Sequence, residues 1–97
     1  MPEMLDAVRL ALRITTLAYD TELQLLISAA LDDLGIAGVD KSLTSAPLIR
    51  RAVITYCRAH FGSPPDYDRL KASYDEQKAQ LQMATGYTDW GNDNAEA

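Results

Sequence analysis

The feature that most constrains the fold is a series of four segments in which apolar residues recur every three or four positions. This spacing gathers the apolar side chains on one face of an α-helix, and Gly, Pro or polar stretches interrupt it between the segments. We therefore predict an all-α fold, a small bundle of about four helices with a flexible C-terminal tail. The predicted helices cover approximately residues 3–13, 20–34, 47–61 and 65–83.

Residues with strong preferences for helix ends suggest where these helices begin and end. Asp20 is expected to be the N-cap of the second helix, and Gly35 is expected to end that helix as its C′ residue. Pro47 suits the first turn of the third helix and favours an extended conformation at Ala46 before it. Pro65 is expected to open the last helix.

Size and composition indicate one small soluble domain. A chain of 97 residues suits one domain, here predicted as residues 1–83 followed by a polar tail over residues 84–97. The longest apolar runs are only a few residues, far below the roughly 20 of a membrane-spanning helix, so no membrane segment is expected. The N-terminal residues lack the pattern of a secretory signal. Cys57 is the single cysteine, which fits a reducing cytosolic setting.

The third predicted helix is apolar over a wide arc, so we expect it to be the central helix. Its apolar face includes Ile49, Ala52, Val53, Tyr56, Cys57 and His60. Cys57 and His60 share this face, and such a pair can act as nucleophile and base or as two zinc ligands. No further Cys or His completes a metal site, and a cysteine at an apolar helix position is usually inert packing. We therefore predict no catalytic residue and a partly buried His60.

The acidic residues Asp32, Asp33 and Asp40 are the other candidates for a metal site. They lack the alternating oxygen ligands and the closing glutamate of a calcium loop. A solvated helix end is the better interpretation, and its fraying is expected because Asp32 and Asp33 oppose the helix dipole. We predict no metal and no cofactor.

The charge balance argues against DNA recognition. The formal charge is −5, and the nearest basic cluster, Arg50, Arg51 and Arg58, is more typical of a solvated or partner-facing edge. The loop between the second and third helices is about 11 residues, whereas a helix-turn-helix motif uses roughly 3–4.

Five apolar or aromatic residues lie outside the predicted core and are candidates for a subunit or partner interface. Leu25 lies off the core face of the second helix, and Leu10 and Ile54 are similar spare positions. Tyr87 and Trp90 belong to the polar tail, where they either fold back onto the core or dock on a partner.

The order and spacing of the four segments resemble the small head-tail connector (adaptor) proteins of tailed bacteriophages. The resemblance covers roughly residues 5–88. The segments that support it are Val8-Arg9 with Leu12-Arg13-Ile14, residues 20–30, residues 47–56, Tyr67-Asp68-Arg69-Leu70 with Tyr74, and residues 83–87. Ala46 departs from the pattern, because a polar cap is expected there.

The resemblance implies a non-catalytic virion protein. Such proteins assemble as a homo-oligomeric ring below the phage portal protein, extend the DNA channel, and dock the stopper or tail-completion component. The ring would be assembled in the host cytoplasm, and DNA would pass through it without sequence-specific binding. The alternatives are a helical interaction module of another bacterial or phage complex and, from the arginine cluster, a nucleic-acid-binding regulator.

Overall fold

The computed structural model describes residues 2–39, 46–62 and 64–83. In these ranges the chain forms four α-helices and no β-strand, which confirms the predicted all-α class. The helices are α1 (Pro2–Leu12), α2 (Asp20–Ile36), α3 (Pro47–His60) and α4 (Tyr67–Met83). The predicted tail and the domain boundary at residue 83 lie at or beyond the end of the described residues and stay predictions.

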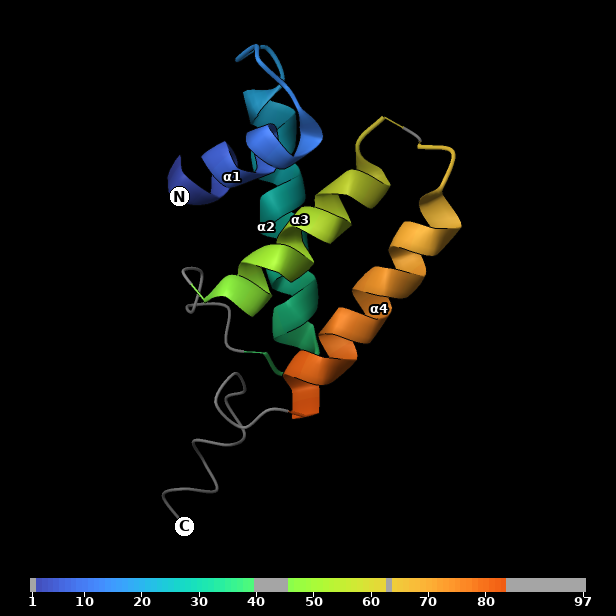
Figure 1. The fold of residues 1–97 in the computed structure, drawn as a ribbon. Coiled ribbons are helices and arrows are strands. Elements are labelled where there is room, and N and C mark those ends of the chain that lie inside the picture. The colour runs from blue at the N-terminus through green and yellow to red at the C-terminus, as the bar shows by residue number, and fades with distance from the viewer. Residues whose placement is uncertain (1, 40–45, 63, 84–97) are drawn as a thin grey trace.

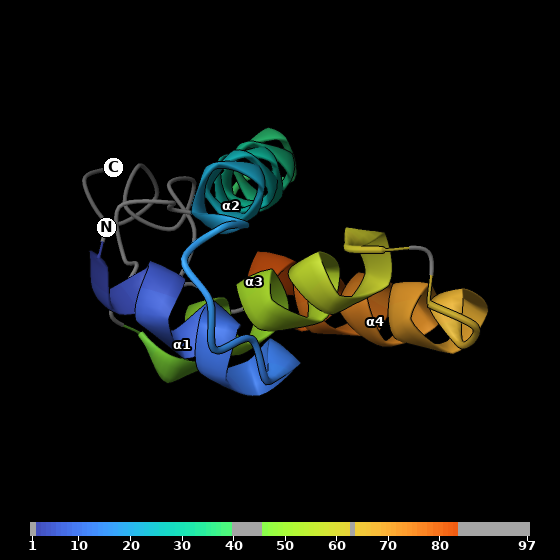
Figure 2. The ribbon, with the colours of Figure 1, turned by 90° about the horizontal axis from the view of Figure 1, so that it is seen from above.

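The four helices form two layers. Figure 2 shows α2 on one side of the molecule, with α1, α3 and α4 together on the other. Helix α3 contacts all three other helices, and α1 also contacts α2. Helix α4 lies along α3 (Figure 1). The prediction that the third helix is central is therefore confirmed.

The core lies between the two layers and is built from one face of each helix. Burial of a Val, Leu or Ile side chain contributes about 1.5–3 kcal/mol, so this shared core is the main source of stability. Helix α2 contributes most of its apolar face to this core. Helix α3 contributes the apolar face that the sequence predicts. The fully buried large side chains are Met4, Val8, Leu23, Ile27, Leu34, Val39, Ile49, Val53 and Cys57.

Helix α2 ends later than predicted, because a different glycine stops it. Gly35 lies inside the helix, so the prediction that it is the C′ residue is wrong. Gly38 has φ +92° and takes that role. The N–H of Gly38 donates to the carbonyl of Gly35 at 3.0 Å, and the N–H of Val39 donates to that of Leu34 at 2.9 Å. These two bonds define a Schellman motif, and the buried Val39 and Leu34 side chains supply its apolar contact.

Helix α1 ends in the same motif without a glycine. Arg13 has φ +59°, the left-handed conformation that ordinarily favours glycine. Its N–H donates to the carbonyl of Leu10 at 3.1 Å, and the N–H of Ile14 donates to that of Arg9 at 2.9 Å. Ile14 then packs against the core. The turn therefore directs an apolar side chain inward at the cost of strain at Arg13.

The observed first residues of α2, α3 and α4 agree with the sequence predictions only in part. Tyr19, rather than Asp20, is the N-cap of α2, and it makes no side-chain capping bond. Asp20 instead forms an ion pair with Arg9 of α1, with 3.2 Å between Oδ1 and Nε. Ala46 is extended as predicted, with φ −67° and ψ 128°. Helix α4 begins at Tyr67, not at Pro65.

None of the helices in the described ranges is both long enough and apolar enough to cross a membrane.

Candidate interaction interface

The structure places the five predicted interface residues in three different situations. Leu10 and Leu25 are largely exposed, at 81% and 68% of their surface. Ile54 is half-buried and packs against the core, so only part of its side chain is available to a partner. Tyr87 and Trp90 lie outside the described residues. The interface role of all five stays a prediction.

The solvent-facing side of α2 carries a stripe, here called the α2 stripe, of the exposed Glu22, Leu25 and Ile36 and the half-buried Ala29. The polar residues Thr21, Gln24, Ser28 and Asp32 are exposed beside it. Leu25 and Ile36 are eleven residues apart, and eleven residues make close to three helical turns, so both project in nearly the same direction. Ile36 is 87% exposed. Ile36 was not among the predicted interface residues, because the predicted helix ended at residue 34 and Ile36 fell in the loop after it.

Helix α2 is also uniformly acidic. Its residues include Asp20, Glu22, Asp32 and Asp33, and no Lys or Arg. Glu22 is exposed and belongs to the α2 stripe. Asp20 and Asp33 bind partners on α1 and α4, so the outer surface of this layer combines exposed aliphatic side chains with the negative charge of Glu22 and Asp32.

The solvent-facing side of α3, here called the α3 ridge, is formed by Leu48, Arg51, Ile54 and Arg58. Leu48 is 46% exposed, and Arg51 and Arg58 are exposed as well. Helix α3 contains three arginines and a histidine but no Asp or Glu. Its charge is therefore opposite to that of α2.

The arginines of α3 differ in their partners. Arg50 faces α1, and its Nη2 lies 3.7 Å from Oε2 of Glu3. Within the described part of the chain, neither Arg51 nor Arg58 has an ion pair or a side-chain hydrogen bond. The α3 ridge therefore presents two cations that form no ion pair with the described residues, on a protein of net charge −5.

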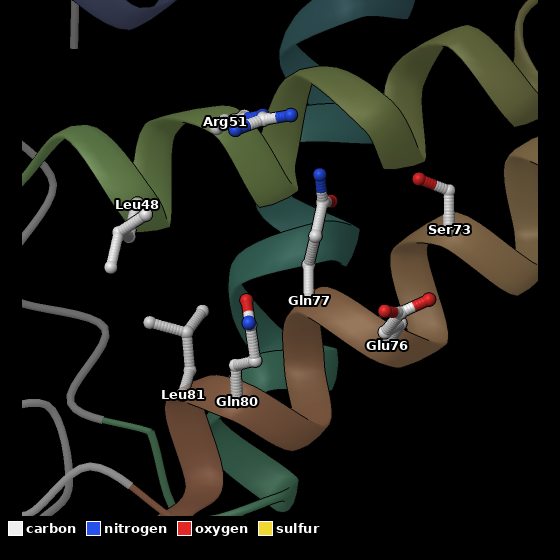
Figure 3. A pocket seen from close by; sticks show the side chains of 7 residues that line it. All are labelled: Leu48, Arg51, Ser73, Glu76, Gln77, Gln80 and Leu81. Carbon is white, nitrogen blue, oxygen red and sulfur yellow. The ribbon is translucent and has the colours of Figure 1, made fainter.

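A groove of about 280 Å³ lies between α3 and α4, and two residues of the α3 ridge, Leu48 and Arg51, belong to its lining. Figure 3 shows Arg51 on α3 across the groove from Gln77 and Glu76 on α4. The side-chain oxygen of Gln77 is buried without a hydrogen-bond partner. The lining is mostly polar side chains, namely Arg51, Ser73, Glu76, Gln77 and Gln80, with Leu48 and Leu81 at one end.

The second helix is tied to the fourth by a polar network. The hydroxyl of Tyr74 donates to Oδ2 of Asp33 at 2.6 Å, and Nζ of Lys78 donates to the same oxygen at 3.2 Å. Partial burial works to raise the pKa of Asp33, but these two bonds outweigh it, so the pKa is below its usual value. Burial, together with the bond to Asp33, raises the pKa of Tyr74.

This network corrects the interpretation of Asp33 as part of a solvated, fraying helix end. Helix α2 continues past Asp33 to Ile36. The sequence analysis missed the network because its partners are 41 and 45 residues apart. No local pattern in the sequence indicates such a contact.

Cys57 and His60 do not form a nucleophile–base pair. Cys57 is fully buried, and burial raises the pKa of its thiol to about 12, so the reactive thiolate is disfavoured. His60 is exposed, which contradicts the predicted partial burial. Its ring instead contacts Tyr56, with 4.3 Å between centroids, and Tyr67 at 5.7 Å. Among the described residues, no group of three or more His, Cys, Asp and Glu side chains could hold a metal ion.

Among the described residues, the candidate functional features are therefore the exposed apolar and charged helix faces. In a comparison with protein families, the family described as "Phage connector protein" matches residues 4–88. No curated protein matches the chain. No solved structure matches it either.

Proposed function

Because the chain belongs to the phage connector protein family, we propose that it is a structural subunit of the head-tail connector. In this proposal the subunits form a closed ring below the portal protein and extend the channel for DNA. The ring then docks the stopper or tail-completion component of the virion. The protein acts by assembly, and it catalyses no reaction.

The observation that most supports assembly is the amount of large apolar surface outside the core. Leu10, Leu25 and Ile36 are each more than two-thirds exposed, on two different helices. A single exposed leucine is ordinary, whereas several on regular helix faces of a small chain are typical of surfaces that a partner covers. The proposal uses these faces for contacts between subunits or with neighbouring virion proteins. Tyr87 and Trp90 are proposed as additional contacts with a partner.

The net charge of −5 supports the proposed role as a channel rather than a DNA-binding protein. Phosphate contacts provide most of the affinity of proteins for DNA, so an acidic ring holds DNA weakly and lets it slide. Sequence-specific recognition is not part of the proposal.

The test is negative-stain electron microscopy of the purified protein over a concentration series, alone and with its cognate portal protein. Closed rings, free or bound to the portal, are the expected result. Small particles that never form rings and never bind the portal would contradict the proposal and favour a helical interaction module of another complex. Tight binding to duplex DNA that weakens steeply with salt would instead favour a nucleic-acid-binding regulator.

A further inference from the structure

The outer faces of α2 and α3 are opposite in charge and belong to opposite layers of the molecule. The α2 stripe combines the apolar Leu25 and Ile36 with one acidic residue, Glu22, and its helix contains no basic residue. The α3 ridge is basic and partly apolar, and its helix contains no acidic residue. Arg51 and Arg58 form no ion pair in the described part of the chain, so the contacts of the isolated subunit do not use these two charges.

The two surfaces point away from each other. Helix α2 contacts α3 and buries Leu23, Ile27 and Leu34, so its exposed stripe lies on the side of α2 that faces away from the core. Helix α3 buries Ile49 and Val53, whereas Arg51 and Arg58 are exposed, so the ridge lies on the side of α3 that faces away from its buried residues. One molecule therefore cannot bring its own stripe and ridge together, whereas two molecules stacked in the same orientation can.

We propose that the α2 stripe of one subunit docks on the α3 ridge of a second copy in a head-to-tail contact. Leu25 and Ile36 would cover Leu48 and the exposed part of Ile54, while Glu22 would lie in the positive field of Arg51 and Arg58. A contact between two different surfaces of identical subunits is heterologous, and repetition of it generates a ring when the rotation closes. This inference rests on the proposed ring and specifies which surfaces form it.

Charge reversal provides the first test. Arg58→Glu and Glu22→Arg, made separately, are each expected to raise the protein concentration needed for assembly by about tenfold. The combined variant Glu22→Arg/Arg58→Glu is expected to recover most of this loss, because the opposite charges are restored with their positions exchanged. The matched control is Arg13→Glu, which reverses another exposed arginine without a side-chain partner in the described ranges. Sedimentation velocity measures assembly, and far-UV circular dichroism verifies that each monomer is folded.

Oxidative cross-linking provides the second test, because it reports which surfaces meet. In the double variant Leu25→Cys/Arg51→Cys, a head-to-tail contact gives a ladder of covalent species longer than dimers. The single variants Leu25→Cys and Arg51→Cys are each expected to form no cross-link, because in a head-to-tail contact the introduced cysteine meets a surface that carries no cysteine. The native Cys57 does not compete, since it is fully buried.

The outcomes separate this inference from the proposed function. Rings that form normally in Arg58→Glu and Glu22→Arg, without a cross-linked ladder, overturn the inference and leave the ring proposal intact. Covalent dimers of Leu25→Cys alone indicate an α2–α2 contact and also overturn it. Loss of salt-dependent DNA binding in Arg58→Glu, with assembly unchanged, assigns the α3 ridge to phosphates instead. A wild-type protein that never self-associates, alone or with the portal, overturns both proposals.

Discussion

The hydroxyl of Tyr74 on α4 donates a 2.6 Å hydrogen bond to the carboxylate of Asp33 on α2, across 41 residues of sequence. Lys78 binds the same carboxylate oxygen one turn later on α4. Tyr74 is almost fully buried, and its ring packs edge-on against Tyr56 of α3. The bond of Tyr74 to Asp33 therefore links the two layers of the fold, together with the bond from Lys78 and the ion pair between Arg9 and Asp20.

Removal of that hydroxyl should weaken the fold. Tyr74→Phe keeps the ring packing but leaves Asp33 with one partner, so we expect the free energy of unfolding to fall by about 1–3 kcal/mol. Urea denaturation followed by circular dichroism measures this difference. Tyr67→Phe is the matched control, because the Tyr67 hydroxyl has no hydrogen-bond partner among the described residues and should change stability little. Equal effects of both substitutions would contradict the importance assigned to the Asp33 bond.

The same network should make the stability of the fold depend on pH in the acidic range. Since the pKa of Asp33 is lower in the folded protein than in the unfolded chain, its ionised form favours folding. This contribution is fully present above the unfolded pKa of about 3.9 and is lost as the pH falls through the lower folded pKa. Wild type should therefore be more stable than Asp33→Asn at pH 7, and the difference should shrink below about pH 4. A difference that stays constant between pH 7 and pH 3 would show that charge is not its cause.

The two left-handed residues that end α1 and α2 should respond oppositely to substitution. Arg13→Gly should stabilise the protein by roughly 0.5–1 kcal/mol, because glycine adopts positive φ without strain. Gly38→Ala should destabilise it by about 1 kcal/mol or more, because alanine is strained at φ +92°. Thermal or urea unfolding measures both. An Arg13→Gly variant less stable than wild type would indicate that the arginine side chain itself contributes to the fold.

Cys57 should be unreactive in the folded protein. Its burial and its pKa of about 12 suppress the thiolate that reacts with disulfide reagents such as DTNB. At pH 8 we expect very slow labelling without denaturant and complete labelling in urea. Rapid labelling of the native protein would show that α3 opens readily from the core.

The position of Leu25 on the α2 stripe can be tested separately from the charges. Leu25→Asp should impair ring formation and leave the monomer helical, because the side chain is exposed in the isolated subunit. Gln24→Asp is the matched control, since it adds the same charge at an exposed position on a neighbouring side of α2. A Leu25→Asp monomer that unfolds would instead place Leu25 in a packed region. Deletion of residues 84–97 should also impair assembly without unfolding the helices.

Local sequence patterns determined the helices of this protein and most of its core. The three-to-four-residue apolar spacing depends on helix geometry alone, so the four helices and the central position of α3 could be predicted without tertiary information. Leu25 and Leu10 were correctly placed off the core face for the same reason. The phage connector family was likewise indicated by the order and spacing of these segments.

Tertiary structure decided what depends on distant partners. Two glycines near the end of α2 are locally similar, and the choice of Gly38 over Gly35 depends on burying Val39 beside Leu34. The sequence analysis could place Asp33 only at a helix end, whereas Tyr74 and Lys78, brought close by the packing of α4, bind its carboxylate. That the α2 stripe and the α3 ridge point in opposite directions is likewise a result of the two-layer packing. A sequence pattern shows which residues share one face of a helix, but it does not show how the faces of two helices are oriented relative to each other.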